Sequence, residues 1–271
     1  MSLDNRADVE VGDQFKGWLE EALPEVSFSL RRLKWYLESR GRHSRQSLRA
    51  MKDRHAGERC FIIGNGPSLN RMDLQPLKHE TAFSLNRGYL YYDRIGRPCD
   101  YLVAVNTLVL QQFAEEISAL DNTKFLAWGC RRWYQPDDRI IYMAGPTRNA
   151  PPRFSTDISR DLWAGATVTY VAMQLAYYMG FKQAILIGVD HSFTTKGKPH
   201  KLVTSEGDDP NHFAPGYFGK GVKWQLPDLE TSELAYTLAR DAYAADGREI
   251  LDATVDGKLT VFPKVSYEDL F

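Results

Sequence analysis

The chain has 271 residues, of which 43% are hydrophobic and 25% are charged. These values fit a globular protein of enzyme size and exclude a peptide hormone, a collagen and a disordered tail. Lys and Arg total 34 against 35 Asp and Glu, so the net charge is -1. The sequence therefore predicts no general attraction to nucleic acid, and any phosphate must be bound by local groups.

The cysteines and the N-terminus narrow the class of protein further. The three cysteines, Cys60, Cys99 and Cys130, are odd in number and have no C-x-x-C spacing, so neither a disulfide framework nor a zinc cluster is expected. The first residues, Met1 to Arg6, lack the basic-then-apolar order of a signal peptide, and no apolar run is long enough to cross a bilayer. The default expectation is a cytoplasmic location.

The first fifty residues have a helical pattern of their own. Apolar residues recur at helical spacing in two segments, Phe15–Leu23 and Phe28–Leu37, with Pro24 between them. The second segment and the residues after it are basic and carry Arg31, Arg32, Lys34, Arg40, Arg42, Arg45 and Arg49. Such a stripe is favoured as a solvated helix face, and docking on a membrane surface or an acidic partner stays open. We predict an N-terminal helical arm over residues 1–54 and a nucleotide-binding transferase domain over residues 55–271.

From Arg59 onward, short apolar runs alternate with longer segments, which is typical of parallel strands joined by crossover helices. This alternation predicts an α/β fold with a Rossmann-like, doubly wound and mostly parallel sheet of about seven strands. The predicted strands are Cys60–Ile63, Ala82–Leu85, Tyr101–Val105, Phe125–Trp128, Ile140–Met143, Ala184–Ile187 and Glu249–Asp252.

Helices are expected in three of the longer gaps, over Leu108–Leu120, Thr167–Met179 and Glu230–Ala245. The middle one is apolar on nearly every side, so we expect a core helix packed on the sheet. The Gly/Pro-rich and charged stretch from Lys196 to Gly221 is the candidate for a mobile loop or lid.

A glycine-rich loop follows the first predicted strand, with the residues Gly64, Asn65, Gly66, Pro67, Ser68 and Leu69. Glycines allow close approach of the backbone to a ligand, and Pro67 suits a first helical turn whose free N–H groups attract a phosphate. The loop lacks the ending of a Walker motif and the third glycine of a dinucleotide fingerprint, which disfavours NAD and P-loop chemistry. Read alone, it could equally be a turn between strand and helix.

Polar residues recur just past other strand ends: Asn86 after the second strand, Asn106 after the third, and Gly188 and Asp190 after the sixth. Ligands of open α/β sheets bind at this edge. Asparagine offers both donors and an acceptor, so these side chains can bind a sugar, a base edge and phosphate oxygens without added charge. The repetition favours a nucleotide site over unrelated turn residues.

The long polar loop holds the candidates for chemistry. His212 can take a proton from an alcohol nucleophile as general base, and Tyr217 and Lys220 can stabilise a departing phosphate. A metal is the weaker alternative, with Asp190, His191 and His212 converging on it, because no close pair has ligand spacing. Ser68 has no nucleophile elbow around it, so a hydrolase triad is not supported.

The segment Cys60–Leu69 resembles the first strand and nucleotide loop of the bacterial sialyltransferases of glycosyltransferase family 42. It is equally similar to the domain family named after the archaeal hydroxymethylpterin diphosphokinase MptE. Met179–Asp190 resembles the second block that these families share, and the resemblance spans residues 59 to 253. It implies that Asn65, Asn86 and Asn106 contact a cytidine nucleotide and that His212 is the general base. The chain has Trp163–Thr169 where the sialyltransferases have Arg-x-x-Ser, which leaves Arg160 as the nearest cation.

Three hypotheses follow. The first is an inverting, sialyltransferase-like glycosyltransferase of surface glycan synthesis, which uses a nucleotide sugar, transfers to a glycan or small-molecule acceptor and requires no cofactor. The second is a diphosphokinase of the pterin type, which needs ATP and Mg²⁺, with Asp190 as metal ligand. The third is a nucleotide-binding module without catalysis. The sequence leaves self-association open.

Overall fold

The structure is a computed structural model that describes residues 24–144, 152–194 and 197–271. The chain divides into two compact units, one ending at Arg42 and the other running from His43 to Phe271. The described helices before the sheet are α2 (Pro24–Leu37) and α3 (Ser39–Met51). The division therefore falls inside α3, and the predicted helix over Phe15–Leu23 lies outside the described residues.

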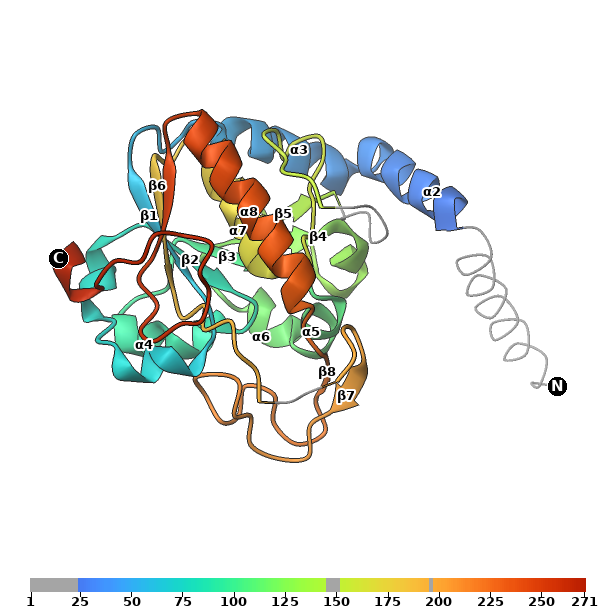
Figure 1. Cartoon of the computed structure of the whole chain (residues 1–271). Coiled ribbons are helices and arrows are strands. Elements are labelled where there is room, and N and C mark those ends of the chain that lie inside the picture. Colours follow the sequence, from blue (N-terminus) through green and yellow to red (C-terminus); the bar gives the residue numbers. More distant parts are fainter. Residues whose placement is uncertain (1–23, 145–151, 195–196) are drawn as a thin grey trace. The chain divides into compact units, whose positions relative to one another are not determined.

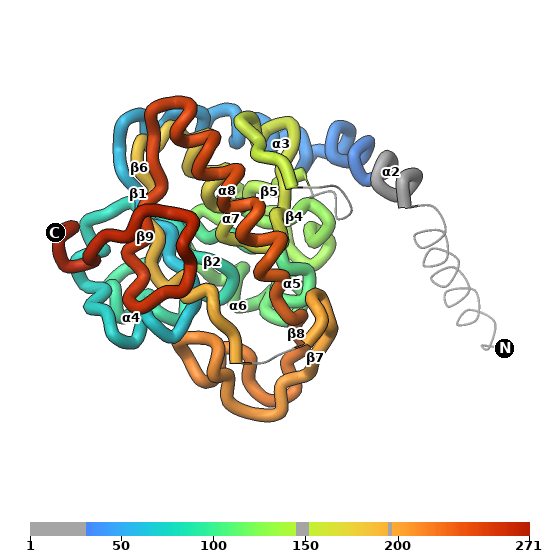
Figure 2. The backbone as a smooth tube through the Cα atoms, in the orientation of Figure 1, coloured from blue at the N-terminus to red at the C-terminus, as the bar shows by residue number. Residues whose placement is uncertain are grey.

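Within the described residues, the second unit is built on one central sheet of seven parallel strands (Figures 1 and 2). All seven predicted strands are present. They are β1 (Arg59–Ile63), β2 (Ala82–Leu85), β3 (Tyr101–Ala104), β4 (Thr123–Ala127), β5 (Ile140–Met143), β6 (Gln183–Ile187) and β9 (Glu249–Asp252). The Rossmann-like fold prediction is confirmed.

The strand order is β5-β4-β3-β2-β1-β6-β9, so the chain reverses direction across the sheet between β1 and β6. Parallel crossovers are right-handed, so this reversal places the connections after β5 on the opposite face from those between β1 and β5. The chain leaves β1 toward β2 and leaves β6 toward β9, which lie in opposite directions across the sheet. Such a divergence opens a crevice at the carboxyl ends of β1 and β6.

Two long helices follow the reversal. The helix α7 (Val168–Tyr178) packs against β1, β2 and β3, and α8 (Leu229–Ala245) packs beside it and against β9. Residues 169–178 of α7 are all buried, which confirms the predicted core helix. The buried amide of Gln174 in α7 accepts hydrogen bonds from the N–H groups of Ser155 and Trp163 and donates to the carbonyl of Trp163. This helix therefore fixes the segment that precedes it.

The other helices in the described part of the chain are short. They are α4 (Tyr92–Ile95), α5 (Thr107–Gln112) and α6 (Ala114–Ser118), with 3₁₀ turns at Pro67–Arg71, Gln75–His79, Gly88–Tyr91, Trp128–Trp133 and Glu268–Leu270. The helix predicted over Leu108–Leu120 is interrupted at Phe113, whose φ of -120° leaves the helical range.

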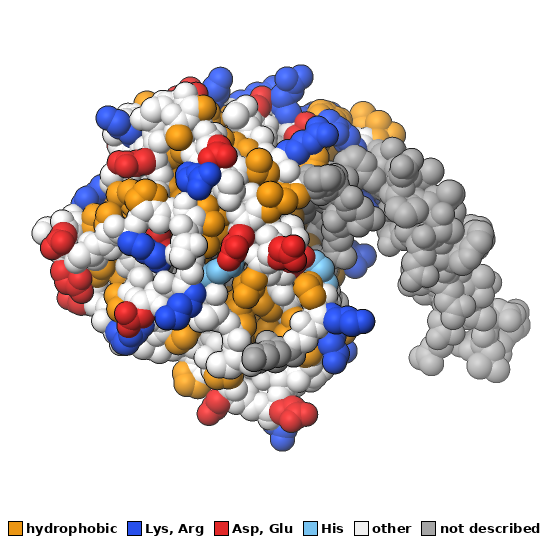
Figure 3. All heavy atoms as spheres, in the orientation of Figure 1, with side chains coloured by type: hydrophobic (Ala, Val, Ile, Leu, Met, Phe, Trp, Pro, Cys, Tyr) orange, Lys and Arg blue, Asp and Glu red, His pale blue; other side chains and the backbone are white. Residues whose placement is uncertain are grey.

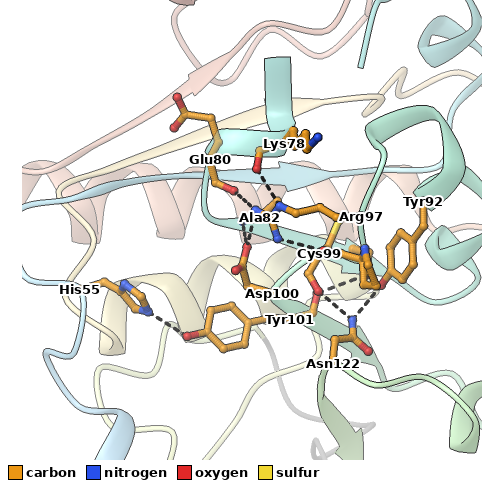
Figure 4. Close-up of polar contacts among 12 residues, drawn as sticks. His55, Lys78, Glu80, Ala82, Tyr92, Arg97, Cys99, Asp100, Tyr101 and Asn122 are labelled. Carbon is orange, nitrogen blue, oxygen red and sulfur yellow. Dashed lines mark hydrogen bonds and ion pairs between the residues drawn. The ribbon is translucent and has the colours of Figure 1, made fainter. Parts of the chain in front are cut away.

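Polar side chains form a hydrogen-bond network at the amino-terminal ends of the strands (Figure 4). Asp100 accepts a hydrogen bond from the N–H of Ala82, the first residue of β2, at 2.9 Å, and Arg97 binds Asp100 and the carbonyl of Glu80. On the same side, His55 is hydrogen-bonded to the hydroxyl of Tyr101 at 2.8 Å. These side chains connect the starts of neighbouring strands.

The long connection between β6 and α8, residues 188–228, is called the β6–α8 segment here. Its described part contains a small antiparallel hairpin, β7 (Leu202–Thr204) with β8 (Lys223–Gln225). The amide of Gln112 in α5 accepts from the N–H of Lys223 and donates to its carbonyl, at 3.0 and 2.8 Å. This side chain fastens β8 to α5.

Candidate functional site

A cavity of about 690 Å³ lies at the carboxyl ends of β1, β2, β3 and β6, and the β6–α8 segment forms part of its wall. On the face drawn in Figure 3, histidine and acidic side chains border an area of hydrophobic side chains. The cavity brings together most of the residues predicted from the sequence: Gly64, Asn65, Gly66, Asn86, Asn106, Gly188, Asp190, His212 and Tyr217. Pro67, Ser68, Lys220 and Arg160 do not line it.

The glycine-rich loop packs directly against the end of β6. A Cβ on Gly66 would overlap the carboxylate of Asp190, and Gly188 has a left-handed φ of 66° with Leu69 against its Cα. Both positions therefore require glycine. The N–H groups of Gly64 and Gly66 donate to the carbonyls of Ile187 and Gly188, so this loop is a structural joint between β1 and β6.

Asp190 adds two hydrogen bonds to this connection between β1 and β6. Its two carboxylate oxygens accept hydrogen bonds from the N–H and the hydroxyl of Ser68, at 3.0 and 2.6 Å. The carboxylate thus takes the position at the start of the short 3₁₀ turn where the sequence predicted a phosphate. The predicted phosphate cradle of Pro67 and Ser68 is corrected on this point, because the donors already have an anionic partner.

Two of the three predicted asparagines have unpaired amide oxygens. Asn65 donates to the carbonyl of Leu85 at 2.9 Å, and its Oδ1 is buried without a hydrogen-bond partner. The Oδ1 of Asn86 is likewise buried and unpaired, and its backbone has a φ of 50°. Unpaired buried acceptors are costly, so these two amides are suited to a ligand that donates hydrogen bonds. Asn106 differs, since its Oδ1 caps α5 by accepting from the N–H groups of Leu108 and Val109.

His212 has the environment of a general base. Its Nδ1 lies 2.6 Å from Oδ2 of Asp209, whose side chain is 3% exposed. A carboxylate only accepts, so Nδ1 carries the proton and Nε2 is left as the acceptor. The imidazole stacks on Tyr217 with ring centroids 4.0 Å apart and an interplanar angle of 5°. The ring is therefore fixed in both tautomer and orientation.

The loop that carries His212 is tied to the sheet at two points. The N–H of Phe213 donates to the carbonyl of Asn65 at 2.9 Å, which places His212 beside the glycine-rich loop. The buried guanidinium of Arg87, just past the end of β2, donates to the carbonyls of Gly216 and Tyr217. Sequence reasoning missed Arg87 and Asp209, because each acts through a contact made only in the folded chain.

Tyr217 and Lys220 do not have the surroundings expected of phosphate ligands. The side chain of Tyr217 is 1% exposed and its hydroxyl accepts from the N–H of Arg87 at 3.3 Å. Burial raises the pKa of Tyr217 well above its ordinary value, so the phenol stays neutral. Its geometry favours positioning of the His212 ring. Lys220 is exposed in the turn that leads to β8 and lies outside the cavity lining.

The rest of the lining is uncharged or acidic. Among the described lining residues there is no Lys or Arg, and the segment 163–169, including Trp163, contributes none either. Two further histidines reach the cavity, His191 paired with Glu233 and His200 paired with Asp228. Hydrophobic side chains of the β6–α8 segment, Phe193, Phe218, Trp224 and Leu226, complete the wall.

The residues present do not fit Mg²⁺. No group of three or more His, Cys, Asp or Glu side chains suited to a metal occurs in the described parts of the chain. Asp190, the expected ligand, has both oxygens bonded to Ser68. Mg²⁺ is usually held by one or two carboxylates together with waters and substrate phosphates. Because the carboxylate expected for it already accepts two hydrogen bonds from Ser68, we derive no step through a metal.

Comparison with known proteins supports the fold. No family model matches the chain, and no curated protein matches it. Among solved structures, it resembles the MAf glycosyltransferase from Magnetospirillum magneticum AMB-1, with a TM-score of 0.50 and 15% identity over 84% of this chain. The match covers 39% of that protein's chain, so this chain spans well under half its length. The likeness shows that the two proteins share an α/β fold.

No helix among the described residues is both long enough and apolar enough to cross a membrane.

Proposed function

We propose that the protein is an inverting glycosyltransferase, similar to the sialyltransferases, that uses a nucleotide-sugar donor. The observation that carries the proposal is the Asp209–His212 pair on the wall of a cavity at the carboxyl edge of the sheet. A histidine with one nitrogen held by a carboxylate and the other free is suited to general-base catalysis. The glycosyltransferase-like fold adds support at the level of architecture alone.

In the proposed reaction, an acceptor hydroxyl attacks the anomeric carbon while the bond from that carbon to the donor phosphate breaks. The hydroxyl proton passes to Nε2 of His212, and the bonding electrons leave with the nucleotide. Nδ1–H remains bonded to Asp209, which stabilises the imidazolium as it forms. Attack from the face opposite the leaving group inverts the configuration.

The composition of the cavity favours a donor whose sugar is linked through a single phosphate. A diphosphate carries more charge, which enzymes usually offset with a metal or with Lys and Arg. The described lining contains neither those side chains nor a group suited to a metal. The same composition disfavours the alternative of an ATP- and Mg²⁺-dependent diphosphokinase. The unpaired oxygens of Asn65 and Asn86 are suited to hydroxyl or amino groups of the nucleoside.

A thermal-shift panel of CMP, CDP, UDP, GDP and ATP, each with and without Mg²⁺, tests the proposal. A ligand that binds only the native state raises the melting temperature, so CMP should stabilise the protein without metal. Stabilisation by ATP only with Mg²⁺ would favour the diphosphokinase, and no response to any nucleotide would favour a module without catalysis.

The base is tested by His212→Ala. Transfer from the donor identified by the panel should fall at least about a hundredfold, while nucleotide affinity stays close to that of the wild type. His43→Gln is the matched control, since His43 lies near Asp138 at 3.9 Å and does not line the cavity. Unchanged turnover in His212→Ala would remove His212 from the mechanism.

A further inference from the structure

A second imidazole bound to a carboxylate lines the cavity, and the reaction proposed above assigns it no role. His191 directly follows Asp190 at the end of β6, and its side chain is 7% exposed. Its Nε2 lies 2.8 Å from Oε1 of Glu233 in α8. Glu233 accepts, so Nε2 donates, and Nδ1 has no hydrogen-bond partner among the described residues.

The position of His191 is fixed from several sides. Its backbone has a left-handed φ of 53°, an unusual conformation for a residue with a side chain. The preceding residue, Asp190, is hydrogen-bonded to Ser68. The centroid of the His191 ring lies 6.2 Å from that of the Tyr236 ring in α8. The hydroxyl of Tyr236 donates in turn to Oγ1 of Thr167, the residue that caps the N-terminus of α7. Residues with a strained backbone conformation that is fixed by their surroundings occur often at functional sites.

The described lining of the cavity offers few groups that could offset the charge of an anion. No Lys or Arg lines the described part of the cavity, whereas Asp190 and Asp228 do. Asp190 is occupied by Ser68, and Asp228 caps α8 by accepting from the N–H and hydroxyl of Thr231. The first turn of α7, with Thr167, Val168 and Thr169, borders the same cavity and carries the positive end of the helix dipole. An anion in this cavity can therefore contact the start of α7 or an imidazole. Of the three histidines in the described lining, His212 is assigned to the acceptor and His200 is 62% exposed, whereas His191 is 7% exposed and has an Nδ1 without a partner among the described residues.

We infer that His191 is a phosphate-binding residue whose Nδ1–H donates to the phosphate of the nucleotide ligand while Glu233 holds Nε2–H. The inference rests on the proposed function and assigns its leaving group a protein partner. A phosphate beside Nδ1 stabilises the doubly protonated ring, which then donates from both nitrogens. Binding of the phosphate thus takes up a proton from solvent when the ring starts neutral, and the charge of the leaving nucleotide is offset as its bond to the sugar breaks.

His191 and His212 have different tasks in this scheme. His212 lies beside the glycine-rich loop through Phe213 and Asn65, and His191 lies beside it through Asp190 and Ser68. Both histidines are therefore connected to the same loop through the residue next to them in sequence. In the proposed scheme, His212 takes the proton of the acceptor hydroxyl and His191 donates to the departing phosphate.

The test compares CMP with cytidine in the wild type and in His191→Gln. The amide nitrogen of glutamine can take the place of Nε2 and keep the bond to Glu233, but it supplies nothing in the place of Nδ1. Titration calorimetry should show CMP affinity reduced about tenfold or more in His191→Gln, because a charged hydrogen bond is lost. Cytidine affinity should be unchanged, and His43→Gln should behave as wild type with both ligands.

Proton uptake gives a second readout that a purely structural role would not move. Calorimetry in two buffers of different ionisation enthalpy should show CMP binding linked to proton uptake in the wild type and less uptake in His191→Gln. Equal CMP affinity and equal uptake in the two proteins would overturn the inference and leave the proposed function standing. If neither CMP nor UMP, GMP or AMP binds the wild type, both the proposed function and the inference fail.

Discussion

The carboxylate of Asp209 decides which nitrogen of His212 can accept a proton. Asp209 also accepts from the N–H of Asn211 through its other oxygen, and its own N–H donates to the carbonyl of Pro215. Its geometry is therefore determined by the loop, and replacement of a single oxygen should alter the tautomer without moving the backbone.

We expect Asp209→Asn to reduce transfer by about a hundredfold or more, because the amide can donate to Nδ1 and leave the proton on Nε2. Nucleotide affinity should change little. The measurement is turnover with the donor found in the nucleotide panel, together with the ¹⁵N shifts of the His212 ring, which report the tautomer. Asp208→Asn is the control, since Asp208 is the neighbouring exposed carboxylate. Full activity in Asp209→Asn would contradict the role assigned to this pair.

Two substitutions of Asn106 can distinguish a structural role of this residue from a role in ligand binding. Its Oδ1 caps α5, and loss of an N-terminal cap costs about 1 kcal/mol. We expect Asn106→Ala to lower the free energy of unfolding by about that amount, measured by urea denaturation. Asn106→Asp should keep the cap and the stability. If CMP affinity also survives in Asn106→Asp, the amide group makes no essential contact with the nucleotide.

At the scale of elements, the strands were predictable and the contacts between loops were not. Every strand of the sheet except β9 is a short run that is mostly apolar and mostly buried, such as Cys60–Ile63, so its composition predicts a strand. The break at Phe113 within the helix predicted over Leu108–Leu120 has no glycine or proline to announce it. The ring of Phe113 packs against the guanidinium of Arg87, with 3.8 Å between Cζ and the ring centroid. A periodic sequence pattern does not reveal such a tertiary contact.

The candidate site shows the same division. The position of Asn65 and Asn86 on one cavity follows from the rule that parallel strands end at a common edge, whereas His212 reaches it from the β6–α8 segment. The partner of Asp190 could not be predicted, because Ser68 is distant in sequence and the bond depends on the packing of Gly66 against β6. The pairing of His191 with Glu233 likewise joins a strand end to a helix that begins much later in the chain.

The joint between β1 and β6 makes a direct prediction. A Cβ at Gly66 would overlap the carboxylate of Asp190 and lie close to the carbonyl of Gly188, which is backbone and cannot rotate away. We expect Gly66→Ala to destabilise the protein by about 2 kcal/mol or more, since it strains a closely packed site and weakens the bonds to Ser68. Thermal and urea unfolding measure this.

Gly129→Ala is the matched control for that substitution. Nothing lies within 4 Å of a Cβ at Gly129, and its φ is not left-handed. The free energy of unfolding of Gly129→Ala should remain within about 0.5 kcal/mol of the wild-type value. Equal stability of Gly66→Ala and Gly129→Ala would show that the end of β6 can move away from the loop.

At the scale of the whole molecule, the balanced net charge of -1 hides an uneven distribution. Residues 31–52 carry eight Lys or Arg, namely Arg31, Arg32, Lys34, Arg40, Arg42, Arg45, Arg49 and Lys52, and one acidic residue, Glu38. In α2, Leu33 and Leu37 are 52% and 64% exposed, and Tyr36 is 41% exposed. Basic and apolar side chains together are typical of segments that contact anionic lipid surfaces.

The full chain should therefore sediment with vesicles that contain phosphatidylserine at low salt, and detach as salt rises, because screening weakens each contact. Replacing Lys34, Arg42 and Arg49 by Gln should reduce the bound fraction severalfold. The control replaces Lys198, Lys201 and Lys220 by Gln, which removes the same charge from exposed positions in the β6–α8 segment. If the two triple variants lose binding equally, attraction depends on net charge and the arm has no special role. If neither changes it, lipid contact through residues 31–52 is wrong.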